Sequence, residues 1–127
     1  MHLICVAPDK VEEIWPHVRS IVKRAIDRGH TDWDFLERNL FSGAWLLWLA
    51  WDGKEIKGAV VTALVKDACE LVACAGNDFR GWIHLIAGIE DYARNEGKKT
   101  MRLIGRRGWS RVLGDYKPTL VMLEKKL

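Results

Sequence analysis

The sequence predicts one α/β domain of the α+β type, with a mixed sheet built around a central β-loop-α-β crossover. Residues 69–75 form an apolar run of strand length, and turn residues follow at 76–81. Apolar residues then recur at helical spacing over 82–97, and a further strand pattern covers 100–105. A strand, a helix and a strand joined in this way become parallel neighbours.

Length and composition are those of an ordinary globular domain. The chain has 127 residues, of which 49% are hydrophobic and 29% charged, so we expect a single domain over 1–127. The sequence contains no apolar run long enough to span a membrane and no charged leader followed by a cleavage site. We therefore expect a soluble, cytoplasmic protein without a membrane partner.

The N-terminal half predicts one strand followed by two helices. Residues 1–7 are apolar and end at a proline, and helical spacing of apolar residues then continues from Val11 to Gly29. Pro16 lies inside this pattern and removes one backbone hydrogen bond, so a kink or an early break is expected there. Residues 31–42 predict a second, shorter helix.

The remaining segments predict the rest of the sheet. Residues 44–51 and 56–65 read as buried strands joined by an Asp-Gly turn, and another turn leads into 69–75. Residues 109–116 have room for a short helix, and 119–125 alternate weakly as a final strand. Only the strands joined by the 82–97 helix are expected to be parallel.

Neither the cysteines nor the histidines form a metal-binding motif. The three cysteines contain no CxxC pair, and the four histidines show no HxxxH or HxE spacing. Strand alternation predicts that Cys69 and Cys74 point to opposite faces of the sheet. No metal site is expected.

Charge is distributed unevenly along the chain. Residues 98–127 contain nine Lys or Arg and two acids, a net charge of +7, whereas residues 1–97 carry a net charge of −4. This asymmetry indicates either an anionic partner for the C-terminal third or a solvated basic face.

The order of the predicted elements resembles that of the GCN5-related N-acetyltransferase family. Residues 90–97 (EDYARNEG) are similar to the end of that family's central helix, and residues 108–127 to its closing helix and hairpin strand. The resemblance implies that acetyl-coenzyme A is the acyl donor. Its pyrophosphate would lie on the loop amides and its pantetheine arm along the fourth strand.

Carried over residue by residue, the resemblance assigns the donor site to one stretch of chain. The cofactor-binding residues it implies are Val72, Ala73, Cys74, Asn77, Arg80, Gly81 and Trp82. The loop departs from the family pattern Arg/Gln-x-x-Gly-x-Gly/Ala, because Asn77 takes the first position and Trp82 the last.

The same resemblance implies a base and an acid for transfer to an amine. Glu70 matches a position where several family members keep a glutamate, and a carboxylate there could take the proton of the amine. Tyr116 is the available acid for the departing thiolate, although the most direct register places Leu113 there. The simpler interpretations are a surface charge for Glu70 and a packed ring for Tyr116.

Residues 105–113 (GRRGWSRVL) also resemble small acetyltransferase-like proteins encoded by bacteriophages and prophages.

The favoured hypothesis is an N-acetyltransferase acting on a small-molecule or protein amine. A scaffold that lost donor binding and serves as a structural or protein-binding protein is the alternative, in which aromatic surface at Trp33, Phe41 and Trp45 lines a pocket or a homodimer interface. A nucleic-acid binder ranks last, because stacking aromatics other than Trp109 are missing from its arginine-rich segment.

Overall fold

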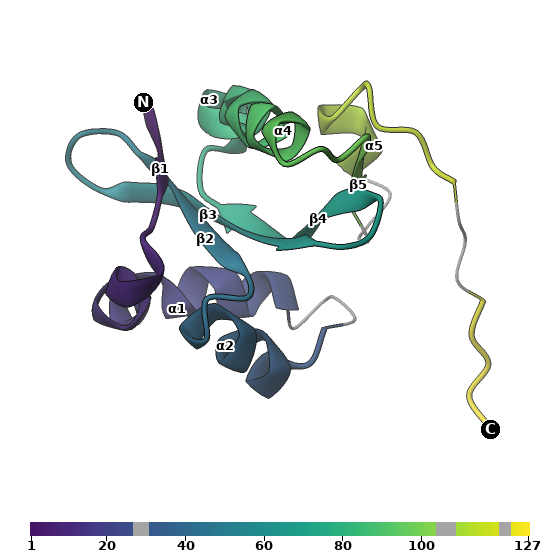
Figure 1. The fold of residues 1–127 in the computed structure, drawn as a ribbon, viewed down its shortest axis with the longest axis horizontal. Coiled ribbons are helices and arrows are strands. Elements are labelled where there is room, and N and C mark those ends of the chain that lie inside the picture. Colours follow the sequence, from purple (N-terminus) through teal and green to yellow (C-terminus); the bar gives the residue numbers. More distant parts are fainter. Residues whose placement is uncertain (27–30, 104–108, 120–122) are drawn as a thin grey trace.

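A five-stranded mixed sheet forms the centre of the molecule (Figure 1). The computed structural model describes residues 1–26, 31–103, 109–119 and 123–127. Neighbouring strands follow chain order, and all pairs are antiparallel except β4 and β5, which are parallel as predicted. The strands are β1 (His2–Cys5), β2 (Leu46–Trp51), β3 (Ile56–Leu64), β4 (Ala68–Gly76) and β5 (Thr100–Leu103).

Helices cover both faces of this sheet, so the sheet separates two apolar cores. One face carries α1 (Val11–Ile26) and α2 (Trp33–Phe41), and Figure 1 shows the other helices on the opposite side. These are α3 (Phe79–Trp82), α4 (Ile86–Asn95) and α5 (Trp109–Val112), with the 3-10 turn η2 (Ile83–Leu85) between α3 and α4. A second 3-10 turn, η1 (Pro8–Lys10), leads directly into α1. The predicted fold class is confirmed.

A kink or an early break is predicted at Pro16; the break is absent, because α1 continues through this residue as one helix. Its buried side chains recur at helical spacing and pack onto the sheet: Val11, Trp15, Val18, Val22 and Ile26. A proline inside a helix costs about 3 kcal/mol, whereas each buried apolar side chain stabilises by roughly 1.5–3 kcal/mol. Burial of this face therefore outweighs the lost hydrogen bond.

The helix predicted over 82–97 is divided into three parts. α3 is a single turn, η2 follows as a 3-10 turn, and α4 then continues regularly to Asn95. The indole of Trp82 is buried and donates a 3.0 Å hydrogen bond from Nε1 to the carbonyl oxygen of Asn77. This bond holds the chain in a tight entry to the helix, which apolar spacing alone does not reveal.

The strand predicted over 119–125 is wrong for the residues that the structure describes there. Thr119 and residues 123–125 are not in a strand, and residues 120–122 lie outside the described residues, as do 104–108. Leu123 is 90% exposed, and Figure 1 shows residues 123–127 away from the sheet. Alternating residues form a strand only when a neighbour binds their backbone groups, so the pattern alone was insufficient.

Candidate functional site

The described pairing of β4 with its parallel partner covers only the first part of β4. Ala68 to Leu71 pair with Thr100 to Leu103, while β4 continues to Gly76 and stays paired with β3 on its other side. Within the described residues, the β5 side of 72–76 has no strand partner. Residues 104–108, which follow Leu103, lie outside the described residues, so the pairing on this side of β4 is described only as far as Leu71.

A bulge at Val72 lies at the point where the parallel pairing ends. Val61 of β3 pairs with Ala73 and Thr62 pairs with Leu71, so Val72 is an extra residue in β4. Val72 and Ala73 both pack against the core under α1, whereas the residues on either side, Leu71 and Cys74, pack against the core under α4. The bulge therefore reverses the alternation of side chains along β4.

This reversal overturns the prediction for the two buried cysteines. Cys69 and Cys74 lie in the same core, beneath α4, and not on opposite faces of the sheet. Burial raises the pKa of the Cys74 thiol to about 12, so it remains protonated at neutral pH. Cys74 can contribute its backbone to a ligand but not a thiolate nucleophile.

The loop after β4 is fixed by backbone contacts at both ends. The amide of Asn77 donates to the carbonyl of Lys57 at 2.8 Å, and that of Gly81 to the carbonyl of Asp78 at 2.9 Å. Asp78 has φ 51° and ψ 53°, a left-handed conformation that few residues other than glycine adopt. The side chains of Asn77 and Arg80 are exposed at this loop, so Arg80 can reach an anion bound there.

Trp82 supports the loop from inside the fold. Its side chain is only 1% exposed, and a Cβ added to Gly58 would lie 2.5 Å from the Cε2 atom of the indole. Gly58 pairs with Gly76, so Trp82 packs over the last pair of β3 and β4. At the position where the family pattern has a small residue, the structure therefore has a large ring that faces the sheet.

Phe79 joins this ring to the C-terminal segment. Its ring stacks on Trp82 with centroids 4.9 Å apart and an interplanar angle of 26°. The ring of Trp109, the first residue of α5, meets Phe79 edge to face at 4.5 Å and 83°. The loop after β4 and the helix that follows β5 are therefore in direct contact.

Glu70 forms an ion pair across the parallel strands. Arg102 is its register partner on β5, and Nη1 of Arg102 lies 3.4 Å from Oε1 of Glu70. Both side chains are partly exposed, at 44% for Arg102 and 29% for Glu70. The pair is only one residue from the last β4–β5 contact, at Leu71 and Leu103.

Tyr116 is hydrogen bonded to α4. Its hydroxyl donates a 2.7 Å bond to Oε2 of Glu90, and its ring packs against the core under that helix. Burial, and then the bond to Glu90, raise the pKa of Tyr116 well above its ordinary value. Leu113, which occupies the direct register, is buried in the same core.

The two predicted catalytic residues lie on opposite faces of the sheet. Glu70 alternates with Cys69 and Leu71, which face α4, so its side chain faces α1, whereas Tyr116 packs on the α4 side. The structure thus joins the predicted donor-site residues in one continuous stretch but does not bring Glu70 and Tyr116 into contact.

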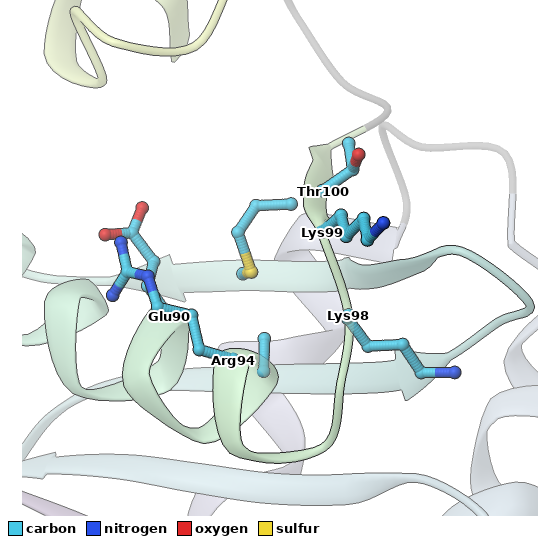
Figure 2. Close-up of a pocket in the computed structure, with 7 residues that line it drawn as sticks. Glu90, Arg94, Lys98, Lys99 and Thr100 are labelled. Carbon is cyan, nitrogen blue, oxygen red and sulfur yellow. The ribbon is translucent and has the colours of Figure 1, made fainter.

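A small hollow of about 90 Å³ lies elsewhere, between the end of α4 and the start of β5. It is lined by Glu90, Ala93, Arg94, Lys98, Lys99, Thr100 and Met101. Figure 2 shows Lys98 extending away from Glu90 and Arg94, so the cationic side chains do not converge on one point. None of the predicted site residues lines this hollow.

Two kinds of feature are absent from the residues that the structure describes. None of their helices combines the length and apolar character needed to cross a membrane. None of their His, Cys, Asp and Glu side chains gather in a group of three or more that could hold a metal ion.

Sequence reasoning missed the partners that hold the predicted residues. In the sequence, Glu90 stands out only as part of a family-like helix end, and Arg102 only as one of the cations in the basic C-terminal third. Their contacts with Tyr116 and Glu70 join positions 26 and 32 residues apart. No local motif encodes such separations, although the charge of each side chain is a weak signal that a partner exists.

No protein-family model matches the chain, and no curated protein sequence matches it. Its structure is similar to solved acetyltransferases. A GCN5-related N-acetyltransferase from Ralstonia eutropha has a TM-score of 0.68 at 12% identity, covering 98% of this chain and 97% of that one. The aminoglycoside N-acetyltransferase AAC(6')-Iy in complex with CoA has a TM-score of 0.67 at 16% identity, covering 99% of each chain.

A third structure is an aminoglycoside acetyltransferase from an uncultured soil metagenomic sample, in complex with sisomicin. It has a TM-score of 0.67 at 11% identity and covers 99% of this chain and 95% of that one. Structural similarity at such low sequence identity shows a shared architecture but not a shared activity. The chain therefore has the fold of the GCN5-related N-acetyltransferases.

Proposed function

We propose that the protein is an N-acetyltransferase that transfers an acetyl group from acetyl-coenzyme A to an amine. The observation that carries this proposal is the parallel pair of β4 and β5, in which β4 leads directly into the loop that contains Arg80. The amide groups of a pantetheine arm are complementary to the N–H and C=O groups of an extended strand such as 72–76. The family resemblance assigns the arm to the same strand.

In this proposal the donor-site residues have different tasks. Val72, Ala73 and Cys74 bind the arm through their backbones, since their side chains face the two cores. Asn77, Arg80 and Gly81 form the loop that receives the pyrophosphate, with Arg80 as its cation. Trp82 positions the loop from the inside.

The reaction places requirements on both faces of the sheet. The amine nitrogen attacks the thioester carbonyl and forms a C–N bond, the C–S bond breaks, and the sulfur leaves as a thiolate. Glu70 accepts the proton lost by the amine on the α1 side, directly or through a water. Tyr116 protonates the thiolate on the α4 side, which requires its hydroxyl to leave Glu90.

The acceptor is a small-molecule or protein amine that approaches from the side of α1 and α2. Phe41 is 38% exposed on that side, so it can border an acceptor. Trp33 instead stacks on Trp15 at 5.8 Å. A homodimer through the aromatic surface of α2 and a phage or prophage setting remain expectations.

Calorimetric titration with coenzyme A, followed by assay of thiol release from acetyl-coenzyme A, tests the proposal. Sisomicin and a polyamine serve as probe amines, because a solved structure with the same fold holds sisomicin. We expect saturable binding of coenzyme A and amine-dependent thiol release. Absence of binding at millimolar coenzyme A would contradict the proposal and favour the scaffold alternative.

A further inference from the structure

The strand β1 forms one edge of the sheet. Its inner neighbour is β2, and β5 forms the opposite edge. Figure 1 shows β1 and β5 on opposite sides of the sheet. Every residue of β1, and of the chain from β1 to the end of α1, is described. Within the residues that the structure describes, the outer side of β1 has no strand partner.

The backbone of β1 presents hydrogen-bonding groups to this outer side. The amide of Val6 donates a 2.9 Å bond to the carbonyl of Leu47, in step with the register of β1 and β2. In an antiparallel ladder, directly bonded pairs of this kind recur at every second residue. The backbone of Ile4 is therefore bonded to β2, whereas the N–H and C=O groups of Leu3 and Cys5 point outward.

This edge lacks most of the features that prevent edge strands from pairing. Such strands are commonly protected by charged side chains, by proline or by a bulge. Residues 1–7 (MHLICVA) contain no Asp, Glu, Lys, Arg or Pro, and the register of β1 with β2 is regular. The protection that β1 does have is its length of four residues, which limits how tightly another strand can bind.

The edge is held in place by packing on one face and open on the other. Leu3 packs against the core under α4, where a Cβ added to Gly88 would lie 2.8 Å from its Cδ2 atom. Ile4 points to the opposite face, beside the buried Leu49 of β2, and is 40% exposed. A strand that is ordered before it binds loses little conformational freedom on binding.

We infer that β1 pairs with β1 of a second copy of this chain, antiparallel about a two-fold axis at Ile4. In this register Leu3 of each copy faces Cys5 of the other, so the outward groups of both residues are paired within β1. Each such pair exchanges two backbone hydrogen bonds. The exposed Ile4 side chains of the two copies then lie directly opposite each other, at a Cα separation of about 4.5 Å.

A second copy fits this edge better than a charged peptide does. The uncharged residues of β1 offer no counter-charge to such a peptide, whereas another β1 carries the same apolar side chains and the same outward groups. A two-fold axis lets one surface satisfy itself in this way. Four residues from each copy make a small interface, so the dimer should be weak. This surface is distinct from the aromatic surface of α2.

Cross-linking tests the register. Opposed residues about 4.5 Å apart at Cα are within the range of a disulfide, so Ile4→Cys in a Cys5→Ser background should form a covalent dimer under mild oxidation. Leu64→Cys in the same background is the control, since Leu64 is 39% exposed at the end of β3. If Ile4→Cys cross-links no faster than Leu64→Cys, the pairing is refuted.

The wild type supplies an internal check. In the proposed register the two copies of Cys5 are roughly 8 Å apart at Cα, which is too far for a disulfide. Cys69 and Cys74 are buried. The wild type should therefore cross-link much more slowly than Ile4→Cys. Equally fast cross-linking through Cys5 would refute the axis at Ile4.

Sedimentation tests the dimer without oxidation. The dimer fraction of the wild type should rise with concentration up to millimolar protein, and Ile4→Lys should raise the dissociation constant at least about tenfold, because it places like charges opposite each other. Leu64→Lys should leave the constant unchanged, and circular dichroism checks that both variants fold. A wild type that is monomeric at millimolar concentration would refute the inference, as would a dimer unaffected by Ile4→Lys, which would belong to another surface.

Hydrogen exchange of the wild type identifies the groups involved. The amides of Leu3 and Cys5 should exchange more slowly as the protein concentration rises, because only the dimer pairs them. The amide of Ile4, already bonded to β2, should depend less on concentration. Fast exchange of Leu3 and Cys5 at every concentration would refute the inference. Protection that does not vary with concentration would also refute it, since a segment of the same chain would then cover the edge.

Discussion

The hydroxyl of Tyr116 donates a 2.7 Å hydrogen bond to the carboxylate of Glu90, which joins the segment after α5 to α4. Because α5 is a single turn, this bond is one of the contacts that hold the C-terminal segment against the body of the protein. It also engages the hydroxyl that we assign to protonation of the thiolate. The hydroxyl of Tyr116 therefore has two roles, one in the stability of the fold and one in the proposed catalysis.

Replacing Tyr116 by phenylalanine tests both the structural and the catalytic role of its hydroxyl. Loss of a hydrogen bond to a charged group should lower the free energy of unfolding by about 1.5–3 kcal/mol, measured by urea denaturation. If Tyr116 is the acid, turnover should also fall by roughly a hundred- to ten-thousandfold. Lower stability with full turnover would leave Tyr116 a structural residue.

The direction of the pKa change of Tyr116 predicts a loss of stability in alkali. The folded protein holds this proton more tightly than the unfolded chain, so the contribution is present below pH about 10 and is lost as the pH rises further. Tyr92, the other tyrosine, also has a raised pKa because of burial. The difference between the ultraviolet titrations of the wild type and of Tyr116→Phe therefore isolates the step that belongs to Tyr116.

Glu70→Gln tests the assignment of the base. The substitution keeps the shape of the side chain and removes the charge opposite Arg102, so turnover should fall by about a hundred- to ten-thousandfold while coenzyme A affinity stays nearly constant. Glu55→Gln is the control, since Glu55 pairs with Lys57 at 2.6 Å on an exposed surface. Full turnover in Glu70→Gln would leave Glu70 as a surface charge.

Arg80→Ala tests whether the loop after β4 binds the pyrophosphate. A charge-assisted contact contributes about 1.5–3 kcal/mol, so coenzyme A affinity should fall by roughly ten- to a hundredfold in titration calorimetry. Arg38→Ala on α2 provides a control with the same change of charge on the opposite face. Equal affinities of the two variants would argue against a phosphate contact at Arg80.

Gly58→Ala should disturb the packing of Trp82. The added methyl would approach the indole to 2.5 Å, and overpacking of this kind costs about 1–3 kcal/mol in the free energy of unfolding. Gly114→Ala should have little effect, because no atom lies within 4 Å of a Cβ at that position. If Trp82 is the cause, combining Gly58→Ala with Trp82→Leu should destabilise less than the sum of the two.

The sequence predicted the architecture because the signals for it are local. Apolar runs bounded by turns marked the first five strands, and the helical spacing after the loop made β4 and β5 parallel. The early break predicted at Pro16 was wrong because burial of a whole helix face, a tertiary effect, outweighs the local effect of the proline. The strand predicted over 119–125 was wrong for the described residues because alternating apolar residues do not by themselves supply a neighbouring strand.

The details of the candidate site were harder to predict. Residues 71–75 are apolar on both faces, so alternation carried no signal for the extra residue at Val72. The break after Trp82 depends on a hydrogen bond back to Asn77, and the ring contact of Phe79 depends on a residue 30 positions away. Such features come from the folded arrangement and not from short-range patterns.

The bulge at Val72 also sets which core receives the side chains at the end of β4. Thr62 and Val61 pair with Leu71 and Ala73, so deleting Val72 would give a regular ladder and leave Ala73 and Cys74 in the cores that they occupy now. A regular ladder that kept every residue would instead exchange Ala73 and Cys74 between the two cores. One inserted amino acid therefore places the thiol of Cys74 under α4 and not under α1.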